Sequence, residues 1–128
     1  MILMMIEDEL QPDEEFERLV AEALDSIPPG LLAWMENVQV TIEDEPPPEI
    51  VRKLSPGGTL FGLYEGIPRT SRDLSYQSLP DKITIYRGPI VRSCVSAGEI
   101  MQEVRRTVIH EVAHHFGIDD ARLKELGW

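Results

Sequence analysis

The chain has 128 residues, of which 42% are hydrophobic and 27% are charged, and its formal net charge is −11. This length suits one globular domain with a core of its own and leaves little room for a second. The negative charge argues against nucleic acid and anionic membrane surfaces as partners, because both are negatively charged themselves.

The negative charge is concentrated in the N-terminal third of the chain. Residues 1–49 carry 14 acidic residues and a single base, Arg18, whereas residues 50–128 carry 9 acids and 11 bases. We interpret the acidic third as a solvent-exposed, solubilising surface, with a basic partner or substrate as the alternative. The single cysteine, Cys94, excludes an internal disulfide, and its apolar neighbours predict that it is buried.

We expect residues 1–11 to form a mobile acidic arm and residues 12–128 to form a single domain. Residues 1–6 are apolar, but the run is short, lacks a basic segment and leads directly into Glu7. We therefore predict neither a signal peptide nor a membrane span, and a cytoplasmic location is the default expectation. A short strand or a partner-binding segment is the alternative for these six residues, and no propeptide is visible.

The first predicted helix begins at Pro12, where a proline followed by three acidic residues suits a helix N-terminus. Its apolar residues recur at helical spacing as one core-facing stripe, made of Phe16, Leu19, Val20, Ala23, Leu24 and Ile27. Two prolines and a glycine at positions 28–30 end this helix. Beyond it we predict a short helical segment at residues 31–36, a strand at 38–42, a short helix at 50–54 and a strand at 59–64.

A long loop is predicted next, at residues 66–80, with Arg69, Arg72 and Tyr76 in it. Loops of this length in small domains are often functional. A third strand is predicted at residues 82–86, and residues 87–89 form a link to the last long helix. Three strands, one long amphipathic helix behind them and smaller helices around them predict an α+β domain.

The long helix is predicted to cover residues 97–116, and both of its ends are marked. Ser96 and Glu99 have the spacing of a capping box at the N-terminus. Gly117 suits the position where the chain leaves the helix with a left-handed residue. A short helix at residues 121–126 ends the chain.

The sequence His-Glu-Val-Ala-His at residues 110–114 lies within this long helix and carries two of the three histidines of the chain. Two imidazoles four residues apart project from one side of a helix, so His110 and His114 can bind the same divalent metal. Glu111 flanks that metal, where a general base acting on an activated water must stand. The apolar residues of the helix face the opposite way. His115 falls on that apolar side, and we expect it to be packed and hydrogen-bonded.

A catalytic zinc site needs three protein ligands and an open position. The spacing His-Glu-x-x-His-x-x-Gly-x-x-Asp places Asp120 after the glycine turn as the third ligand. The alternative is that Asp119 or Asp120 caps the short last helix, and Asp119 could cap while Asp120 binds. Glu125 is a weaker candidate for the third ligand.

Three stretches of the chain resemble the small bacterial zincin-like metallopeptidases, also described as minimal zincins. They are residues 104–127, which contain the motif, and residues 60–68 and 79–90. The resemblance covers nearly all of the chain from Phe16 onward, and the three stretches together are more specific than the motif alone. It implies a zincin-like minimal domain of the α+β class, with a zinc site and peptidase activity, but no settled substrate.

We therefore predict a zinc-dependent metallopeptidase that binds one zinc ion per chain through His110, His114 and Asp120. Glu111 is predicted to act as the general base in the hydrolysis of a peptide or protein substrate. The alternative is a metal-binding regulatory or interaction module without turnover, because a chain of this size leaves little protein to form a substrate cleft.

Two further parts of the predicted site depend on parts of the chain distant from the motif. A tyrosine or arginine across the cleft is expected to stabilise the oxyanion, and the sequence does not rank the candidates Tyr64, Arg72, Tyr86 and Arg87. By resemblance, residues 82–86 are expected to be the edge strand that pairs with an extended substrate.

Overall fold

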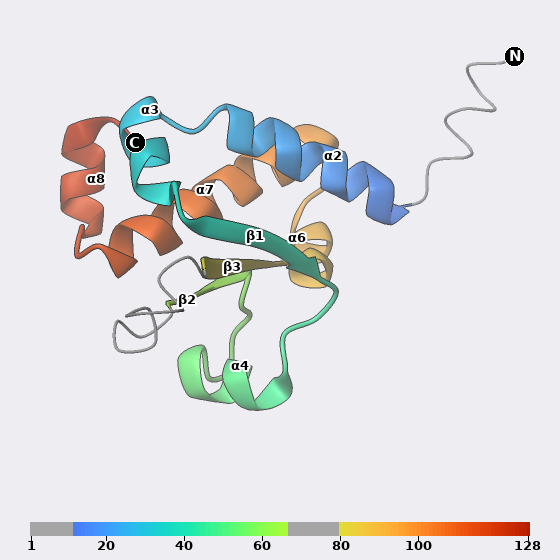
Figure 1. The fold of residues 1–128 in the computed structure, drawn as a ribbon. Helices are drawn as coiled ribbons and strands as arrows, with labels where there is room; N and C mark the ends of the chain where they lie inside the picture. The colour runs from blue at the N-terminus through green and yellow to red at the C-terminus, as the bar shows by residue number, and fades with distance from the viewer. Residues whose placement is uncertain (1–11, 67–79) are drawn as a thin grey trace, which may run out of the picture.

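The computed structural model describes residues 12–66 and 80–128 (Figure 1). Its fold is α+β, which confirms the predicted class. The helices are α2 (Pro12–Asp25), α3 (Pro29–Leu32), the 3-10 turn η1 (Ala33–Met35), α4 (Pro48–Leu54), α6 (Arg87–Ser93), α7 (Ala97–His115) and α8 (Asp120–Leu126). The strands are β1 (Val38–Glu43), β2 (Gly62–Glu65) and β3 (Asp81–Tyr86). The predicted N-terminal arm and most of the predicted long loop lie outside the described residues.

The three strands form one mixed sheet in the order β1-β3-β2. β1 runs parallel to β3, with Val40 opposite Ile83, and β2 runs antiparallel to it, with Tyr64 opposite the same isoleucine. The prediction that residues 82–86 form the substrate-pairing edge strand is therefore wrong, because β3 has a partner on each side. Within the described sheet, the edge strands are β1 and β2.

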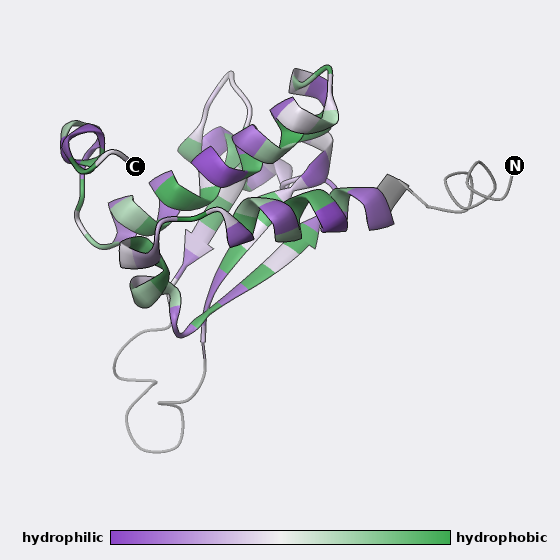
Figure 2. Cartoon of the chain, turned by 90° about the horizontal axis from the view of Figure 1, so that it is seen from above, coloured by the Kyte–Doolittle hydropathy of each residue, from purple (hydrophilic) through white to green (hydrophobic). Residues whose placement is uncertain are grey.

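Helices α2 and α7 pack against each other on one face of the sheet, and α4 lies on the other side (Figure 1). Apolar residues alternate with polar ones along both long helices, as Figure 2 shows, so each helix has one face for the core. The core joins Ile83 and Ile85 of the sheet to valines of α7. The predicted core stripe of the first helix is confirmed at Phe16, Leu19, Val20 and Ala23 of α2 and at Ile27 just beyond its end, while Leu24 is half-buried.

Strand β2 begins later than the predicted range of residues 59–64 and ends one residue beyond it. The hydroxyl of Ser55 donates a hydrogen bond to the carbonyl of Thr59 at 3.0 Å, which holds the start of that range in the preceding turn. Contact with the sheet begins at Phe61, whose carbonyl accepts a 2.9 Å hydrogen bond from the amide of Tyr86. Local turn bonds therefore shorten the strand.

We predicted a simple link at residues 87–89, whereas in the structure these residues form the first turn of helix α6. A proline is tolerated in the first turn of a helix, because the amides there have no partner within the helix. Pro89 lies in that first turn, and the amide of Gly88 donates instead to the carbonyl of Asp44 at 2.8 Å. The proline therefore marks the start of a helix here.

The predicted ends of the long helix are confirmed. The Ser96 side chain accepts a hydrogen bond from the amide of Glu99 at 3.1 Å, and the Glu99 carboxylate accepts one from the amide of Val95 at 3.3 Å. Gly117 has a φ of 82°, a left-handed conformation that most other residues rarely adopt. These contacts fix where α7 starts and where the chain turns back.

Helix α7 and strand β2 are closely packed at Gly62. A Cβ atom at this position would lie 2.7 Å from Cγ2 of Thr107 and 3.1 Å from the carbonyl oxygen of Thr84. We therefore expect Gly62→Ala to lower the free energy of unfolding by about 1–3 kcal/mol, the usual cost of overpacking. Urea unfolding measures this change. Gly98→Ala is the matched control, since a Cβ there would come no closer than 3.9 Å to Ser96 Oγ, and equal stabilities for both variants would contradict the packing argument.

Candidate metal centre

His110 and His114 lie one turn apart on α7, on the side of the helix that faces away from the core. Their ring centroids are 5.6 Å apart, and the side chains are 37% and 49% exposed. Val108 and Val112 on the same helix are fully buried. The amphipathic pattern of α7 therefore buries its valines and directs the histidine pair outward, as predicted.

Asp120 lies directly against this histidine pair. Its Oδ1 atom is 3.3 Å from Nδ1 of His110 and 3.0 Å from Nε2 of His114. One potential ligand atom from each of the three residues lies within 4.8 Å of the other two. Two imidazole nitrogens and one carboxylate oxygen are a donor set that suits zinc and leaves a coordination position open. The residues therefore fit the predicted ion, and their binding of it stays a prediction.

The two neighbouring aspartates have different contacts. The Asp119 carboxylate caps α8 by accepting a hydrogen bond from the amide of Arg122 at 2.9 Å, while Asp120 turns to the histidines. Of the alternatives left open by the sequence, the structure therefore has the one in which Asp119 caps and Asp120 reaches the site. Glu125 forms an ion pair of 2.9 Å with Arg122 and lies outside the cluster.

Glu111 is half-buried beside the cluster, and its Oε1 atom accepts a 3.0 Å hydrogen bond from the backbone amide of Tyr64 in β2. Burial raises the pKa of this carboxyl group, against the lowering effects of the Tyr64 hydrogen bond and of the two nearby histidines. A carboxyl group with a raised pKa in a cleft is typical of general acids and bases. The environment of Glu111 therefore suits the role that its place in the motif predicts.

A cleft of about 240 Å³ opens between α7 and the segment that leads into β2. His110, Glu111 and His114 line it together. The remaining lining residues are Leu60, Phe61, Gly62, Glu103, Arg106 and Thr107. The close packing at Gly62 therefore brings the edge of the sheet to the face of the helix that carries the histidine pair.

A family model described as zincin-like metallopeptidase matches residues 35–128, which include all the residues of the cleft. The chain belongs to the zincin-like metallopeptidase family. Zincin-like proteins typically bind zinc, in keeping with the donor set of the cluster.

Among solved structures, this zincin-like chain is similar to a conserved hypothetical protein from Thermus thermophilus. The two share 26% sequence identity with a TM-score of 0.53, and the match covers 89% of this chain and 95% of the other. No curated protein sequence matches the chain. Among the described residues, no helix combines the length and the apolar character that a membrane span requires.

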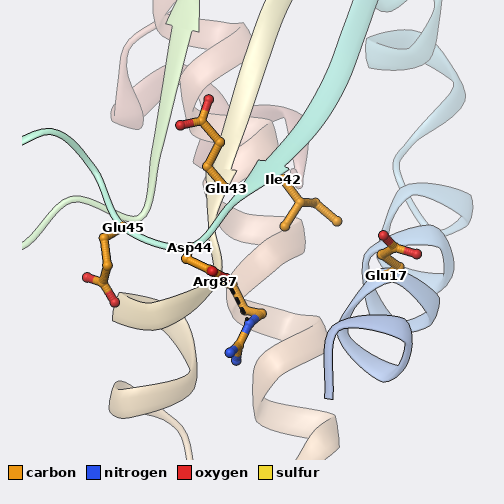
Figure 3. Close-up of a pocket in the computed structure, with 6 residues that line it drawn as sticks. All are labelled: Glu17, Ile42, Glu43, Asp44, Glu45 and Arg87. Atoms are coloured by element: carbon orange, nitrogen blue, oxygen red, sulfur yellow. Dashed lines mark hydrogen bonds and ion pairs between the residues drawn. The ribbon is translucent and has the colours of Figure 1, made fainter. Parts of the chain in front are cut away.

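The oxyanion candidates taken from the sequence do not line the cleft of this zincin-like chain where the structure describes them. The Tyr64 hydroxyl donates to Asp81 at 2.7 Å, and Arg87 lies in a separate acidic pocket, 3.3 Å from Asp44 (Figure 3). Tyr86 is buried, and because side chains alternate along β3, it lies on the other face of the sheet from Ile85. Arg72 lies outside the described residues.

Arg106 is a cleft residue that the sequence reasoning missed. It lines the cleft from α7 and lies 4.0 Å from the carboxylate of Glu103, with its own side chain 70% exposed. The available signal was its position four residues before His110, on the same side of the helix. In the described part of this zincin-like chain, Arg106 is the basic residue that lines the cleft.

Two further predictions about single side chains are confirmed only in part. His115 is packed as predicted, since it stacks on Tyr64 with ring centroids 3.9 Å apart, but its side chain is 37% exposed and its Nε2 atom lies 3.9 Å from the Asp81 carboxylate, too far for the predicted hydrogen bond to that group. Cys94 is half-buried, and burial raises the pKa of its thiol. Both residues lie near the ends of helices, where packing on one side leaves the other side open to solvent.

We expect Glu111→Gln to raise the stability of the metal-free protein at neutral pH. A carboxyl group whose pKa is raised by folding destabilises the folded protein when it is ionised, and this cost disappears as the pH falls below the ordinary value of 4.5. Glutamine is neutral throughout and can still accept the amide hydrogen bond from Tyr64. Urea unfolding from about pH 8 down to about pH 4 should show a stability gain that shrinks towards acid. A gain that is constant with pH would rule out the ionised carboxylate as its cause.

Proposed function

We propose that this chain is a zinc-dependent peptidase that hydrolyses a peptide or protein substrate. The observation that carries the proposal is the convergence of His110, His114 and Asp120 within 4.8 Å, next to Glu111 in one cleft. Membership of the zincin-like metallopeptidase family supports it.

In the proposed reaction, the two histidines and Asp120 hold the ion through two nitrogens and one oxygen. A bound zinc ion supplies a Lewis acid that acidifies a water molecule and polarises the substrate carbonyl. Glu111 takes a proton from the attacking water and passes it to the leaving amine, and burial, which raises the pKa of its carboxyl group, makes it a stronger base for the first of these two transfers. Because Oε1 accepts the Tyr64 amide, we assign the proton transfer to Oε2 of Glu111.

We place the extended substrate along β2, in place of the strand expected from the sequence. The amide of Tyr86 donates to the carbonyl of Phe61, the residue before β2, so the backbone N–H and C=O groups of every second residue from Phe61 onward point towards β3. The backbone groups of Gly62 and Tyr64 therefore point to the free edge, and the Tyr64 amide already reaches Glu111 there. Arg106 is our candidate for binding a carbonyl or carboxylate oxygen of the substrate, because it lines the same cleft.

The proposal is tested by incubating zinc-loaded protein with an unbiased peptide library and identifying the cleaved bonds by mass spectrometry. We expect cleavage that a chelator stops and that added zinc restores. A protein that binds one zinc ion per chain and cleaves nothing would instead favour the metal-binding module without turnover. A protein that binds no zinc would contradict both functions.

A further inference from the structure

The side chain of Tyr64 is held on two sides by residues that the proposed reaction does not use. Its hydroxyl donates a 2.7 Å hydrogen bond to Oδ2 of Asp81, a residue only 9% exposed. Its ring stacks on the imidazole of His115 at a centroid distance of 3.9 Å and an interplanar angle of 20°. Nε2 of His115 lies 3.9 Å from the same carboxylate oxygen of Asp81. The three side chains therefore form one cluster, which we call the Tyr64 clamp.

Tyr64 links the clamp to Glu111. The backbone amide of Tyr64 donates to Glu111 Oε1 at 3.0 Å, so one residue joins the clamp through its side chain and the proposed general base through its main chain. The clamp also joins three elements, since Tyr64 belongs to β2, Asp81 opens β3 and His115 ends α7. A shift of any of these elements would move the amide that orients Glu111.

Strand β2 needs such an anchor because it is a short edge strand. It has four residues and pairs only with β3 in the described sheet. Short edge strands open locally at low free-energy cost, since few hydrogen bonds and contacts hold them. At the end of the strand the contact is close, and a Cβ atom on Gly66 would lie 3.0 Å from Cε1 of His115. The clamp therefore lies where β2 would otherwise open first.

We propose that Asp81 and His115 are positioning residues that act through Tyr64 on Glu111. They hold the Tyr64 side chain, which fixes the strand, and the fixed amide then sets the direction of the Glu111 carboxylate. The hydrogen bond to Glu111 is a property of the metal-free fold. Only the kinetic consequence of the clamp rests on the proposed peptidase function.

Amide hydrogen exchange of Tyr64 tests the clamp without any activity measurement. The chain has three tyrosines, so protein labelled with 15N-tyrosine gives three backbone signals, and that of Tyr64 is assigned by its loss in Tyr64→Phe. We expect Asp81→Ala and His115→Ala to speed exchange of the Tyr64 amide about tenfold in metal-free protein. This is the size of effect expected when the hydrogen bond from the Tyr64 amide to the charged Glu111 carboxylate is weakened. The Tyr86 amide, bonded to the Phe61 carbonyl in the sheet, is the internal reference and should not change.

Conservative variants distinguish the clamp from a general loss of stability. Asp81→Asn keeps an acceptor for the Tyr64 hydroxyl, and His115→Phe keeps a flat ring to stack on, so both should exchange close to wild type. Thr84→Val is the matched control, because Thr84 is a buried polar residue of β3 that takes no part in the clamp. Equal acceleration at Tyr64 and Tyr86, or no acceleration at Tyr64, would overturn the proposal.

A kinetic test follows on any peptide that the wild-type protein cleaves. Tyr64→Phe and Asp81→Ala should each lower kcat about tenfold with KM and zinc content unchanged, and the double variant should resemble either single one. Additive losses, with Tyr64→Phe much the larger, would mean that the hydroxyl acts on the substrate directly and would overturn the positioning role. If wild type cleaves no peptide, the proposed function fails, and the exchange experiment still decides whether the clamp exists.

Discussion

Glu111→Gln is expected to abolish peptide hydrolysis while leaving one zinc ion bound per chain. General bases typically contribute a factor of about 10²–10⁴ to the rate, and glutamine cannot take the proton. Glu111 supplies none of the three clustered ligand atoms, so the metal site should keep its donors. The measurement is kcat on a peptide identified in the library screen, with zinc content by elemental analysis of the same sample.

Glu103→Gln is the matched control for this prediction. Glu103 also lies on α7 and lines the same cleft, but its carboxylate accepts a hydrogen bond from the Thr107 hydroxyl at 3.3 Å and lies outside the ligand cluster. Its replacement should change kcat far less. If the Glu111 variant keeps its activity, the proton is taken by another group, and if it loses zinc, Glu111 belongs to the ligand set.

Glu111→Gln is expected to raise the stability of the metal-free protein and to abolish peptide hydrolysis. Together, these two effects distinguish a catalytic role of Glu111 from a structural one. The half-buried carboxylate of Glu111 lowers the stability of the folded protein at neutral pH, as its raised pKa indicates, so a purely structural role would not favour glutamate at this position. Active sites often keep such unfavourable groups because the reaction needs them. A variant that is more stable and inactive would therefore identify Glu111 as a residue retained for chemistry.

The sequence is sufficient for those parts of the fold that depend on local patterns. Helix α7 follows from its periodicity, its capping box and Gly117, because these signals lie within or next to the helix itself. The order of the strands does not follow, because alternation shows which face of a strand is buried and does not show how many partners its edges have. The prediction of an edge strand therefore fails for the segment 82–86, which is the centre of the sheet.

The same distinction applies to the candidate site. His110, His114 and Asp120 are predictable because all three lie within one helix, one turn and the start of the next helix, where spacing fixes geometry. The amide of Tyr64 is not predictable, since it reaches Glu111 from 47 positions away and a backbone donor has no residue type to recognise. The facing wall of the cleft is likewise formed by long-range packing at Gly62.

Substitution of the neighbours Asp119 and Asp120 should affect different properties, namely stability for Asp119 and zinc affinity for Asp120. Asp120→Ala is expected to weaken zinc binding by more than about a hundredfold, because even residues that only support the ligands contribute about 10–100-fold. Asp119→Ala is expected to keep the zinc and to lower the free energy of unfolding by about 1 kcal/mol, the usual value of an N-cap. Competition with a zinc-binding dye and urea unfolding measure the two quantities on both variants.

The double variant His110→Ala, His114→Ala is the reference for complete loss of zinc binding, since it removes both nitrogen donors. If Asp120→Ala loses nearly as much zinc affinity as this double variant while Asp119→Ala binds zinc like wild type, Asp120 is the third ligand. Loss of zinc in both aspartate variants would mean that α8 must be capped before Asp120 can reach the histidines 3.0–3.3 Å away. Retention of zinc in Asp120→Ala would remove it from the ligand set, and the chain would then bind the metal through the two histidines and a donor outside this cluster.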